Sequence, residues 1–204
     1  MNKLYLLLAI LRYACYAPIS IAATFVVWLT SWLLPAFSFF TKDEELPKWL
    51  RWAQTHDNSL SSLWRGSEGA KHRANNAYPW LYKYSNEQIE QSLILKYLAR
   101  MFWLIRNPAY GVAHNVLGFV NRNAPLIYRS SSVVGEAAPS WWWLEIYDAG
   151  HGGWNRYSFV LRSNWQYSKS RYFRIYLGFK GVSSMAVSPN FMLTTHLNPF
   201  RKVD

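Results

Sequence analysis

Four residues have side chains suited to acid–base chemistry: His114, Glu145, Asp148 and His151. In a membrane-embedded enzyme, a histidine and carboxylates that meet in one cleft would transfer protons to and from a lipid or a lipid-linked substrate. His114 and Asn115 are the strongly polar side chains in the middle of an uncharged stretch, so His114 is a candidate general base or metal ligand. The favoured alternative is a hydrogen-bonded pair that fixes helix packing.

The wider pattern of reactive residues matches no familiar catalytic or metal site. The five histidines are dispersed along the chain, and the single cysteine, Cys15, excludes a disulfide within it. The sequence contains no motif for nucleotide phosphates, for a nucleophile or for a metal pair at helical or ribbon spacing. We therefore expect no cofactor and no metal, and a protein that is not an enzyme is favoured.

Arginine and aromatic residues form a second group of interest, because together they bind phosphate groups or make protein interaction hot spots. Glu145, Arg156 and Arg174 are expected to be cross-strand neighbours on one face of a sheet. The candidate binding residues on this face are Trp143, Arg156, Tyr172, Arg174 and Tyr176. The favoured alternative is that a cross-strand salt bridge here only stabilises the sheet.

The element that must position these residues is an antiparallel β-meander over residues 140–181. Alternation with a period of two predicts three strands, in SWWWLEIYD, WNRYSFVLR and RYFRIYLGF. In each strand one face is apolar and the other carries Trp, Tyr, Arg and Glu. We expect the apolar face to pack on helices and the polar aromatic face to remain open to water, lipid or a partner.

Two helices are predicted before the meander, over residues 86–106 and 108–120. Ser85 and Gln88 match a capping box for the first helix. Asn107 is a suitable cap for the second, and Pro108 suits its first position. The second helix is uncharged and too short for an ordinary membrane span, so it is expected to be buried or half-inserted.

The N-terminal region is the most apolar part of the chain. Between Arg12 and Lys42 lie 29 residues without a formal charge, and these predict a transmembrane helix over about residues 16–40. Residues 3–12 form a short interfacial helix or lengthen the span. Because Arg12 breaks the apolar core that a cleaved signal peptide needs, we expect the segment to be retained.

A short helix in LPKWLRWA is expected to follow the membrane segment. Its apolar residues share one side, which leaves Lys48 and Arg51 free to meet lipid phosphates. Trp49, Arg51 and Trp52 are therefore candidate headgroup-binding residues, and packing of this helix on the protein is the equally weighted alternative. The predicted organisation is an anchor at 1–41, an interfacial helix and linker at 42–84, and a membrane-proximal α+β domain at 85–204.

The overall charge favours an anionic lipid bilayer as a partner. The chain has 22 Lys and Arg against 11 Asp and Glu, a net charge of +11. Each base near an anionic membrane surface contributes on the order of 1 kcal/mol. Nucleic acid is the less favoured counter-ion, because the bases are scattered singly. The basic surplus after the membrane segment favours a cytoplasmic C-terminal domain.

Several short segments resemble those of another group of proteins. They are LPKWLRW from Leu46, Gln54–Thr55, Asp57–Leu60, Arg106–Pro108, His114–Asn115 and Leu117–Gly118. In these segments the chain resembles uncharacterised small integral membrane proteins encoded by tailed bacteriophages, although Ser61–Ser62 stands where those proteins have an Asp-Gly pair. The resemblance implies phage origin and a location in the inner membrane of the bacterial host. It implies no particular activity.

Three functions follow from these observations. The favoured one is a phage-encoded integral inner-membrane accessory protein that binds a host membrane protein or the lipid surface, in host takeover, anti-defence or superinfection exclusion. The others are the membrane-embedded enzyme and a membrane-tethered nucleic-acid binder. The expected fold is an α+β membrane protein with one N-terminal transmembrane helix, two further helices and a C-terminal antiparallel β-meander.

Overall fold

The computed structural model describes residues 3–55, 59–65, 80–117, 124–132, 140–148, 156–180 and 192–202. The chain is α+β and divides into two compact units. Unit 1 comprises Met1–Ile21 and Leu117–Asp204, and unit 2 comprises Ala22–Val116. The long N-terminal helix α1 (Lys3–Thr30) begins in unit 1 and ends in unit 2.

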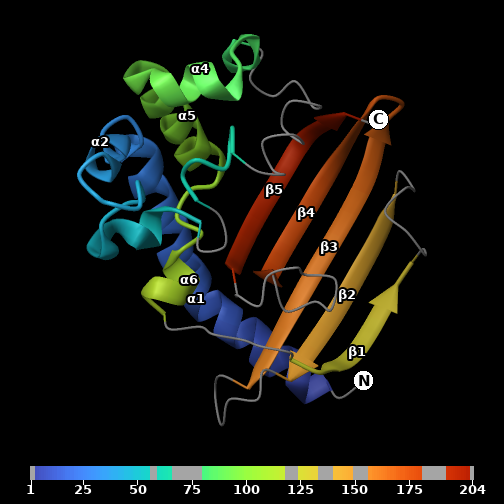
Figure 1. Ribbon diagram of the computed structural model, residues 1–204. Coiled ribbons are helices and arrows are strands. Elements are labelled where there is room, and N and C mark those ends of the chain that lie inside the picture. Colours follow the sequence, from blue (N-terminus) through green and yellow to red (C-terminus); the bar gives the residue numbers. More distant parts are fainter. Residues whose placement is uncertain are drawn as a thin grey trace. The chain divides into compact units, whose positions relative to one another are not determined.

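Unit 1 contains a five-stranded antiparallel sheet whose strands follow one another in chain order (Figure 1). They are β1 (Leu126–Ser131), β2 (Trp141–Asp148), β3 (Tyr157–Ser168), β4 (Arg171–Lys180) and β5 (Met192–Lys202). The three-stranded meander predicted over 140–181 is confirmed by β2, β3 and β4. The sheet is wider than predicted, because β1 and β5 pair with its edges although neither has a clear alternation of apolar and polar residues.

The two faces of this sheet differ in composition and in burial. The apolar face carries Leu144, Ile146, Phe159, Leu161, Ile175, Leu177 and Phe179, and the polar face carries Trp141, Trp143, Glu145, Tyr147, Arg162 and Tyr176. The expectation that the polar face remains open is wrong for its centre, because Trp141, Glu145 and Tyr147 are all buried. Polar groups tolerate burial when they are hydrogen-bonded, as these prove to be at Glu145 and Tyr147.

Helix α1 differs from its predicted boundaries of 16–40. It begins at Lys3 and runs without a break through Arg12 and Pro18. It ends at Thr30, where the hydroxyls of Thr30 and Ser31 bond to the carbonyls of Val26 (2.7 Å) and Trp28 (3.0 Å). A turn then leads to α2 (Leu34–Ser38), which has Pro35 in its first turn, where the missing N–H costs no hydrogen bond.

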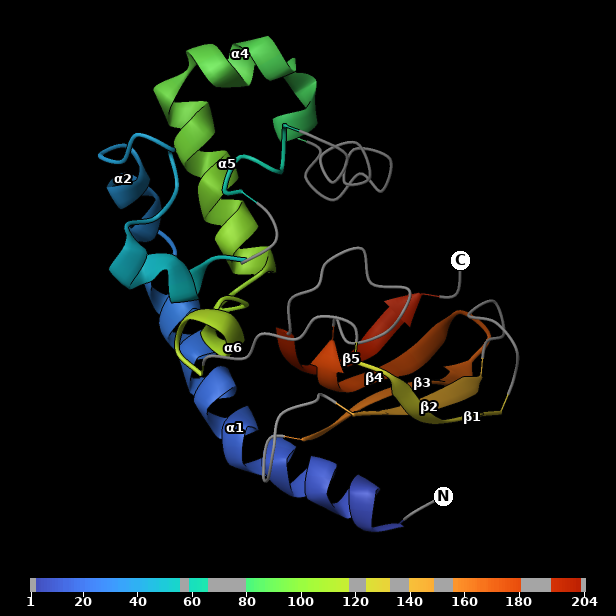
Figure 2. The same cartoon turned by 60° about the horizontal axis from the view of Figure 1, so that its bottom comes forward.

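Unit 2 contains two helices where one was predicted over 86–106. They are α4 (Asn86–Gln91) and α5 (Leu93–Arg106), and Figure 2 shows the sharp change of direction between them. The predicted capping box is confirmed, with the Gln88 N–H donating to Ser85 Oγ at 3.2 Å. The chain divides at Ser92 because this residue is extended and its hydroxyl caps α5 through the Leu95 N–H (3.3 Å).

The helix predicted over 108–120 is also shorter in the part of the chain that the structure describes. Here α6 spans Val112–Asn115, and residues 118–120 lie outside the described ranges. Ala109 has a left-handed backbone with φ of 55°, so no α-helix can run from Pro108 through it.

The short helix predicted in LPKWLRWA is present as a 3-10 helix, η1 (Lys48–Ala53), and a second one, η2 (Leu81–Lys83), precedes α4. The expected grouping of its apolar side chains on one side is wrong. Leu50 and Ala53 are buried, whereas Trp49 is 67% exposed. A 3-10 helix has three residues per turn, so Leu50 and Ala53 eclipse each other and Trp49 projects elsewhere.

Candidate functional site

The exposed side of α1 is apolar along its length. The exposed residues that define this outer stripe are Leu4, Leu7, Leu11, Ile19, Phe25, Val26 and Leu29, each between 44 and 74% exposed. Their spacing of three, four and seven residues places them on one side of an α-helix. With 28 residues α1 is about 42 Å long, and it is long and apolar enough to cross a membrane.

The opposite side of the N-terminal half of α1 is docked on the sheet. Arg12 is fully buried, and its Nη1 donates to the Tyr157 carbonyl (3.1 Å) and to Ser158 Oγ (3.0 Å). Its guanidinium lies 4.6 Å from the centre of the Phe179 ring. The Tyr13 hydroxyl donates to the Thr194 carbonyl at 3.0 Å. Polar contacts to the protein therefore lie on one side of this half of the helix, and the apolar stripe lies on the other.

The end of α1 makes contacts of its own within unit 2. Trp28 Nε1 donates to the carbonyl of Ile105 on α5 at 3.1 Å. The hydroxyl of Tyr97, also on α5, donates to the carbonyl of Trp32 just after α1. The outer stripe is nevertheless continued here by exposed Leu29, so its apolar character extends over both halves of the helix.

A buried carboxylate lies at the centre of the polar face of the sheet. Glu145 is 3% exposed and accepts hydrogen bonds from Arg129 Nε (2.9 Å) and from the Tyr147 hydroxyl (2.6 Å). Arg129 also lies over the ring of Trp143 at 5.1 Å. A buried carboxylate with a charged partner and a hydroxyl partner is stabilised where it is, so this group serves the packing of β1 on β2.

A row of large side chains crosses the strands beside this carboxylate. Trp143 is opposite Arg162, and Arg162 is opposite Tyr176. Arg162 Nη2 donates to the Tyr176 hydroxyl at 3.0 Å, and its guanidinium lies 4.7 Å from the centre of the Tyr176 ring. Two predicted binding residues, Trp143 and Tyr176, are thus brought into one row. Arg162, which joins them, was not among the predicted binding residues.

The expectation that Glu145, Arg156 and Arg174 are neighbours is wrong. Glu145 is opposite Val160, whereas Arg156 donates to Asp148 at the end of β2 (3.0 Å). Arg174 is opposite Asn164 and donates to its side-chain oxygen at 3.0 Å. The register of the strands decides these distances, and alternation along single strands does not fix it.

Arg174 also lies 5.7 Å from the ring of Tyr172, which is buried. Of the five candidate binding residues on the sheet, Arg156 is exposed, Trp143, Arg174 and Tyr176 are half-buried and Tyr172 is buried. A single exposed surface made of all five is therefore not present.

The structure does not bring the candidate acid–base residues together where it describes them. Glu145 and Asp148 are three positions apart on β2, so their side chains lie on opposite faces of the sheet. Asp148 is engaged with Arg156. The side chain of His114 and the whole of His151 lie outside the described residues. Across the described ranges, no group of three or more His, Cys, Asp or Glu residues is arranged to hold a metal ion.

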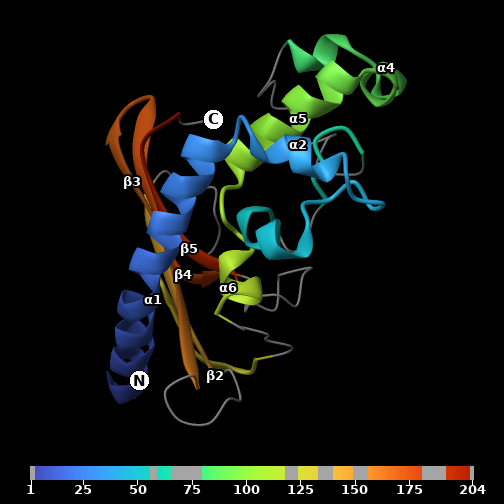
Figure 3. The ribbon, with the colours of Figure 1, turned by 90° about the vertical axis from the view of Figure 1, so that its left-hand side faces the viewer.

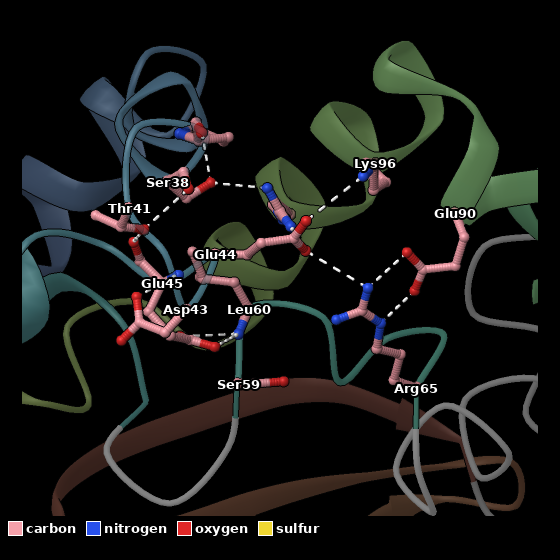
Figure 4. A network of polar contacts seen from close by, with 12 residues as sticks. Ser38, Thr41, Asp43, Glu44, Glu45, Ser59, Leu60, Arg65, Glu90 and Lys96 are labelled. Carbon is pink, nitrogen blue, oxygen red and sulfur yellow. Dashed lines mark hydrogen bonds and ion pairs between the residues drawn. The ribbon is translucent and has the colours of Figure 1, made fainter.

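Unit 2 contains a network of charged groups around Glu44 (Figure 4). Fully buried Arg100 bonds to Glu44 Oε2 (2.6 Å) and to Ser38 Oγ (3.0 Å), and its guanidinium lies 4.6 Å from the centre of the Phe39 ring. Lys96 and Arg65 approach the same carboxylate at 3.6 and 3.5 Å. We call Glu44, Arg65, Lys96 and Arg100 the Glu44 cluster. It connects the turn after α2 to α5.

The two acids beside Glu44 organise the polypeptide around η1. Asp43 forms an ion pair with Arg51, which also donates from Nε to the Leu46 carbonyl at 3.1 Å. Glu45 accepts hydrogen bonds from Gln54 Nε2 (2.6 Å) and from the Leu60 N–H (3.2 Å). Burial raises the pKa of Glu45, and these two hydrogen bonds oppose that rise.

These contacts change the expectation for the headgroup-binding residues in η1. Arg51 is engaged with Asp43 and is not free, contrary to the expectation from the sequence. Trp52 is half-buried, and Trp49 contacts the ring of Phe37 while remaining mostly exposed. Trp49 is the part of the predicted headgroup site that the structure leaves accessible.

Two segments that are far apart in the sequence, at residues 51–54 and 109–115, meet in unit 2. The Ala109 N–H donates to the Ala53 carbonyl (3.0 Å), and Asn115 Nδ2 donates to the Arg51 carbonyl (3.2 Å). At Gly111 a Cβ atom would lie 2.4 Å from the Arg51 carbonyl oxygen, so only glycine allows this approach. These residue types at these positions are explained by contact between two distant segments.

A family model described as a family of unknown function, DUF7338, matches residues 5–204. The chain belongs to this family. The comparison with curated proteins and the comparison with solved structures found no match. The match extends over both units of the DUF7338 protein, so the sheet and the helical unit are parts of one family architecture.

Two structural features of this DUF7338 protein were not predicted from its sequence. The docking of Arg12 on β3 joins positions 146 residues apart, and no local pattern signals such a contact. The Glu44 cluster was missed although the run Asp43–Glu44–Glu45 and the bases of α5 were evident. Their spacing in the chain does not show that the turn and the helix meet.

Proposed function

We propose that the protein attaches to the bacterial inner membrane through α1 and acts there as a binding protein rather than as an enzyme. The observation that carries this proposal is the outer stripe, whose apolar residues extend along the helix with Cys15 among them and no charged side chain. An exposed apolar surface of this length marks a membrane or protein contact. A helix that formed the core of a water-soluble protein would have buried these residues.

The docked side of α1 supports its retention in the mature protein. Tyr13 contacts the rings of Phe159 and Phe179 on the apolar face of the sheet, and Tyr5 stacks on Tyr157. Removal of α1 by a signal peptidase would expose these rings and leave Ser158 without its partner Arg12. The helix therefore serves unit 1 as a packing element as well as a membrane element.

A binding role is supported by the state of the polar groups that the structure describes. Glu44, Glu145 and Asp148 are each committed to arginines, and each of these pairs joins neighbouring elements. The resemblance to phage membrane proteins leads us to propose that the partner is the host inner membrane or a protein in it. Binding to such a partner would act in host takeover, anti-defence or superinfection exclusion.

Vesicle flotation with stripe variants tests the proposal. The triple variant Leu7→Gln, Leu11→Gln, Ile19→Gln removes three exposed apolar side chains without touching Arg12 or Tyr13. If each loses about 1 kcal/mol of burial in lipid, partition into vesicles falls by roughly 100-fold. Leu126→Gln, at a residue of similar exposure on β1, is the matched control and should float like the wild type. Wild-type protein that stays in the aqueous fraction, or a triple variant that floats normally, would refute membrane attachment through α1.

A further inference from the structure

A second exposed apolar surface lies on the sheet of unit 1. Trp165, Tyr167 and Leu197 are 61, 58 and 57% exposed, and Trp142 is 39% exposed. Trp142 and Leu197 lie at the two ends of one cross-strand row that runs through Ser163 and Ile175. Trp165 continues along β3 on the same face, and Tyr167 follows it at the irregularity of the β3–β4 pairing between Gln166 and Ser168. We call these four residues the hairpin patch, because they flank the β3–β4 hairpin.

The chemistry of the hairpin patch is that of a membrane interface. Trp and Tyr side chains have an apolar body and a polar atom, and they concentrate at the level of lipid headgroups. The Tyr167 hydroxyl donates to the Pro199 carbonyl at 2.5 Å, which holds the ring on the surface between β3 and β5. Exposed Leu197 adds apolar area that water does not favour.

The charge around the patch selects an anionic surface. Lys169 and Arg171 flank the turn of the hairpin, and both are exposed. No acidic residue occurs between Asp148 and Asp204, whereas eight bases occur in this stretch. A segment of this kind is attracted to anionic lipid headgroups, and no acid within it weakens the attraction.

The position of the patch relative to α1 gives the surface its orientation. Trp142, Trp165 and Leu197 of the patch are on the apolar face of the sheet, the face whose Phe159 and Phe179 contact Tyr13 of α1. In Figure 3 the first half of α1 and the far ends of β3 and β4 extend toward the same side of the sheet. One flat surface on that side would meet both the hairpin patch and the part of the outer stripe that belongs to unit 1, namely Leu4, Leu7, Leu11 and Ile19.

We propose that the hairpin patch binds the headgroup region of an anionic bilayer, and that the first half of α1 lies along the same leaflet instead of crossing the membrane. This inference rests on the proposed attachment through α1. A helix held to the sheet by Arg12 and Tyr13 cannot be surrounded by lipid, whereas it can insert its outer stripe. Interfacial helices insert by about 5–10 Å, which brings the sheet to the level of the headgroups.

Site-specific fluorescence in vesicles tests this orientation. In a Cys15→Ser background, Ser170→Cys places an environment-sensitive label in the turn between Lys169 and Arg171. Ser131→Cys labels an exposed position opposite Trp143, on the polar face, and serves as the control. Native Cys15 carries the label on the outer stripe. Vesicles of phosphatidylcholine with or without phosphatidylglycerol contain a lipid with a nitroxide near the headgroup, which quenches labels that contact the bilayer.

With phosphatidylglycerol, we expect quenching at Cys15 and Ser170 and none at Ser131. The pair Lys169→Glu, Arg171→Glu should lower the ratio of lipid-bound to water-exposed label at Ser170 by roughly 30-fold, since two bases contribute about 1 kcal/mol each. Lys83→Glu, an exposed base of unit 2, should leave that ratio unchanged.

Each other outcome overturns the inference in a recognisable way. Quenching at Cys15 without quenching at Ser170 would leave attachment through α1 intact and refute the hairpin contact. Quenching at none of the sites would refute the proposed attachment itself. Equal quenching at Ser131 and Ser170 would refute the one-sided orientation. A Ser170 label that responds to single-stranded DNA but not to vesicles would identify the patch as a nucleic-acid surface.

Discussion

Two arginines, Arg12 and Arg100, are completely buried, and both lie 4.6 Å from the centre of a phenylalanine ring. They differ in their polar partners. Arg100 donates to a carboxylate, that of Glu44, whereas Arg12 donates to the Tyr157 carbonyl and the Ser158 hydroxyl. Burial of a guanidinium is costly unless its N–H groups are hydrogen-bonded. Loss of a partner of either arginine should therefore lower the free energy of unfolding.

The substitution Glu44→Gln should therefore destabilise unit 2 more than the substitution Asp43→Asn at the neighbouring residue does. The first substitution leaves the buried Arg100 without a counter-charge and should lower the free energy of unfolding by about 2 kcal/mol or more. The second affects an exposed ion pair with Arg51 and should cost less than about 1 kcal/mol. Chemical denaturation in detergent measures both. Equal losses would contradict the role assigned to Glu44.

The pair of Glu90 and Arg65 should make stability depend on pH. Hydrogen bonding by Arg65 lowers the pKa of Glu90 below the ordinary value of a glutamate, 4.5. Stabilisation by the ionised carboxylate is therefore complete above pH 4.5 and is lost as the pH falls through the lower pKa of the folded state. In the Glu90→Gln variant, the free energy of unfolding should fall less steeply at acid pH. The slope of the stability–pH curve between pH 6 and 8 should change little. An unchanged acid limb would show that the pair does not titrate in this way.

At the scale of elements, α1 has two structural roles, and each depends on a different side of the helix. One side completes the packing of the apolar face of the sheet, and the other exposes the outer stripe. Pro18 does not prevent this, because the helix continues through it from Lys3 to Thr30. A charged side chain is costly in lipid, so a buried arginine bonded to a strand indicates that this side of α1 contacts protein and not lipid.

Arg12→Ala tests this division. It removes the guanidinium from between Ser158 and Phe179 and should lower the free energy of unfolding by about 2–4 kcal/mol, because a cavity and an unpaired hydroxyl remain. Lys3→Ala, at an exposed base of the same helix, should change stability by less than about 0.5 kcal/mol. If α1 instead left the sheet to cross lipid, Arg12→Ala would not weaken the sheet, and its unfolding would match that of the control.

At the scale of the whole molecule, a net charge of +11 accompanies an exposed apolar helix. The two forces respond differently to salt. Screening weakens attraction between exposed charges, while burial of apolar surface is unaffected by screening. The combination predicts membrane binding with a salt-sensitive part and a salt-resistant part.

Raising the salt concentration from 0.1 to 1 M shortens the screening length from about 10 to about 3 Å. Binding to vesicles with anionic lipid should fall toward the level seen with neutral lipid, and binding to neutral vesicles should persist. Sedimentation of vesicles at both salt concentrations measures this. Complete loss from anionic vesicles at high salt would indicate that charge alone holds the protein to the membrane.

Much of the secondary structure follows from local patterns. The alternation in SWWWLEIYD and its two successors predicts β2, β3 and β4, and Ser85 with Gln88 predicts the start of α4. The predictions from local patterns were wrong where the backbone conformation of a single residue interrupts a helix that the neighbouring residues favour. Ser92 divides the helix over 86–106, and left-handed Ala109 shortens the next one. Each break depends on the backbone conformation of one residue, and a periodicity measured over a window of residues does not resolve this.

By itself the sequence determined the apolar helix, the basic charge and the strands of the meander, because each is a property of neighbouring residues. Only the tertiary structure decided that Arg129 pairs with Glu145, that Arg12 docks on β3, and that the polar face of the sheet is buried at its centre. These contacts join positions up to 146 residues apart, and their distances are set by strand register and helix docking. Register depends on pairings between strands, so no single segment contains it.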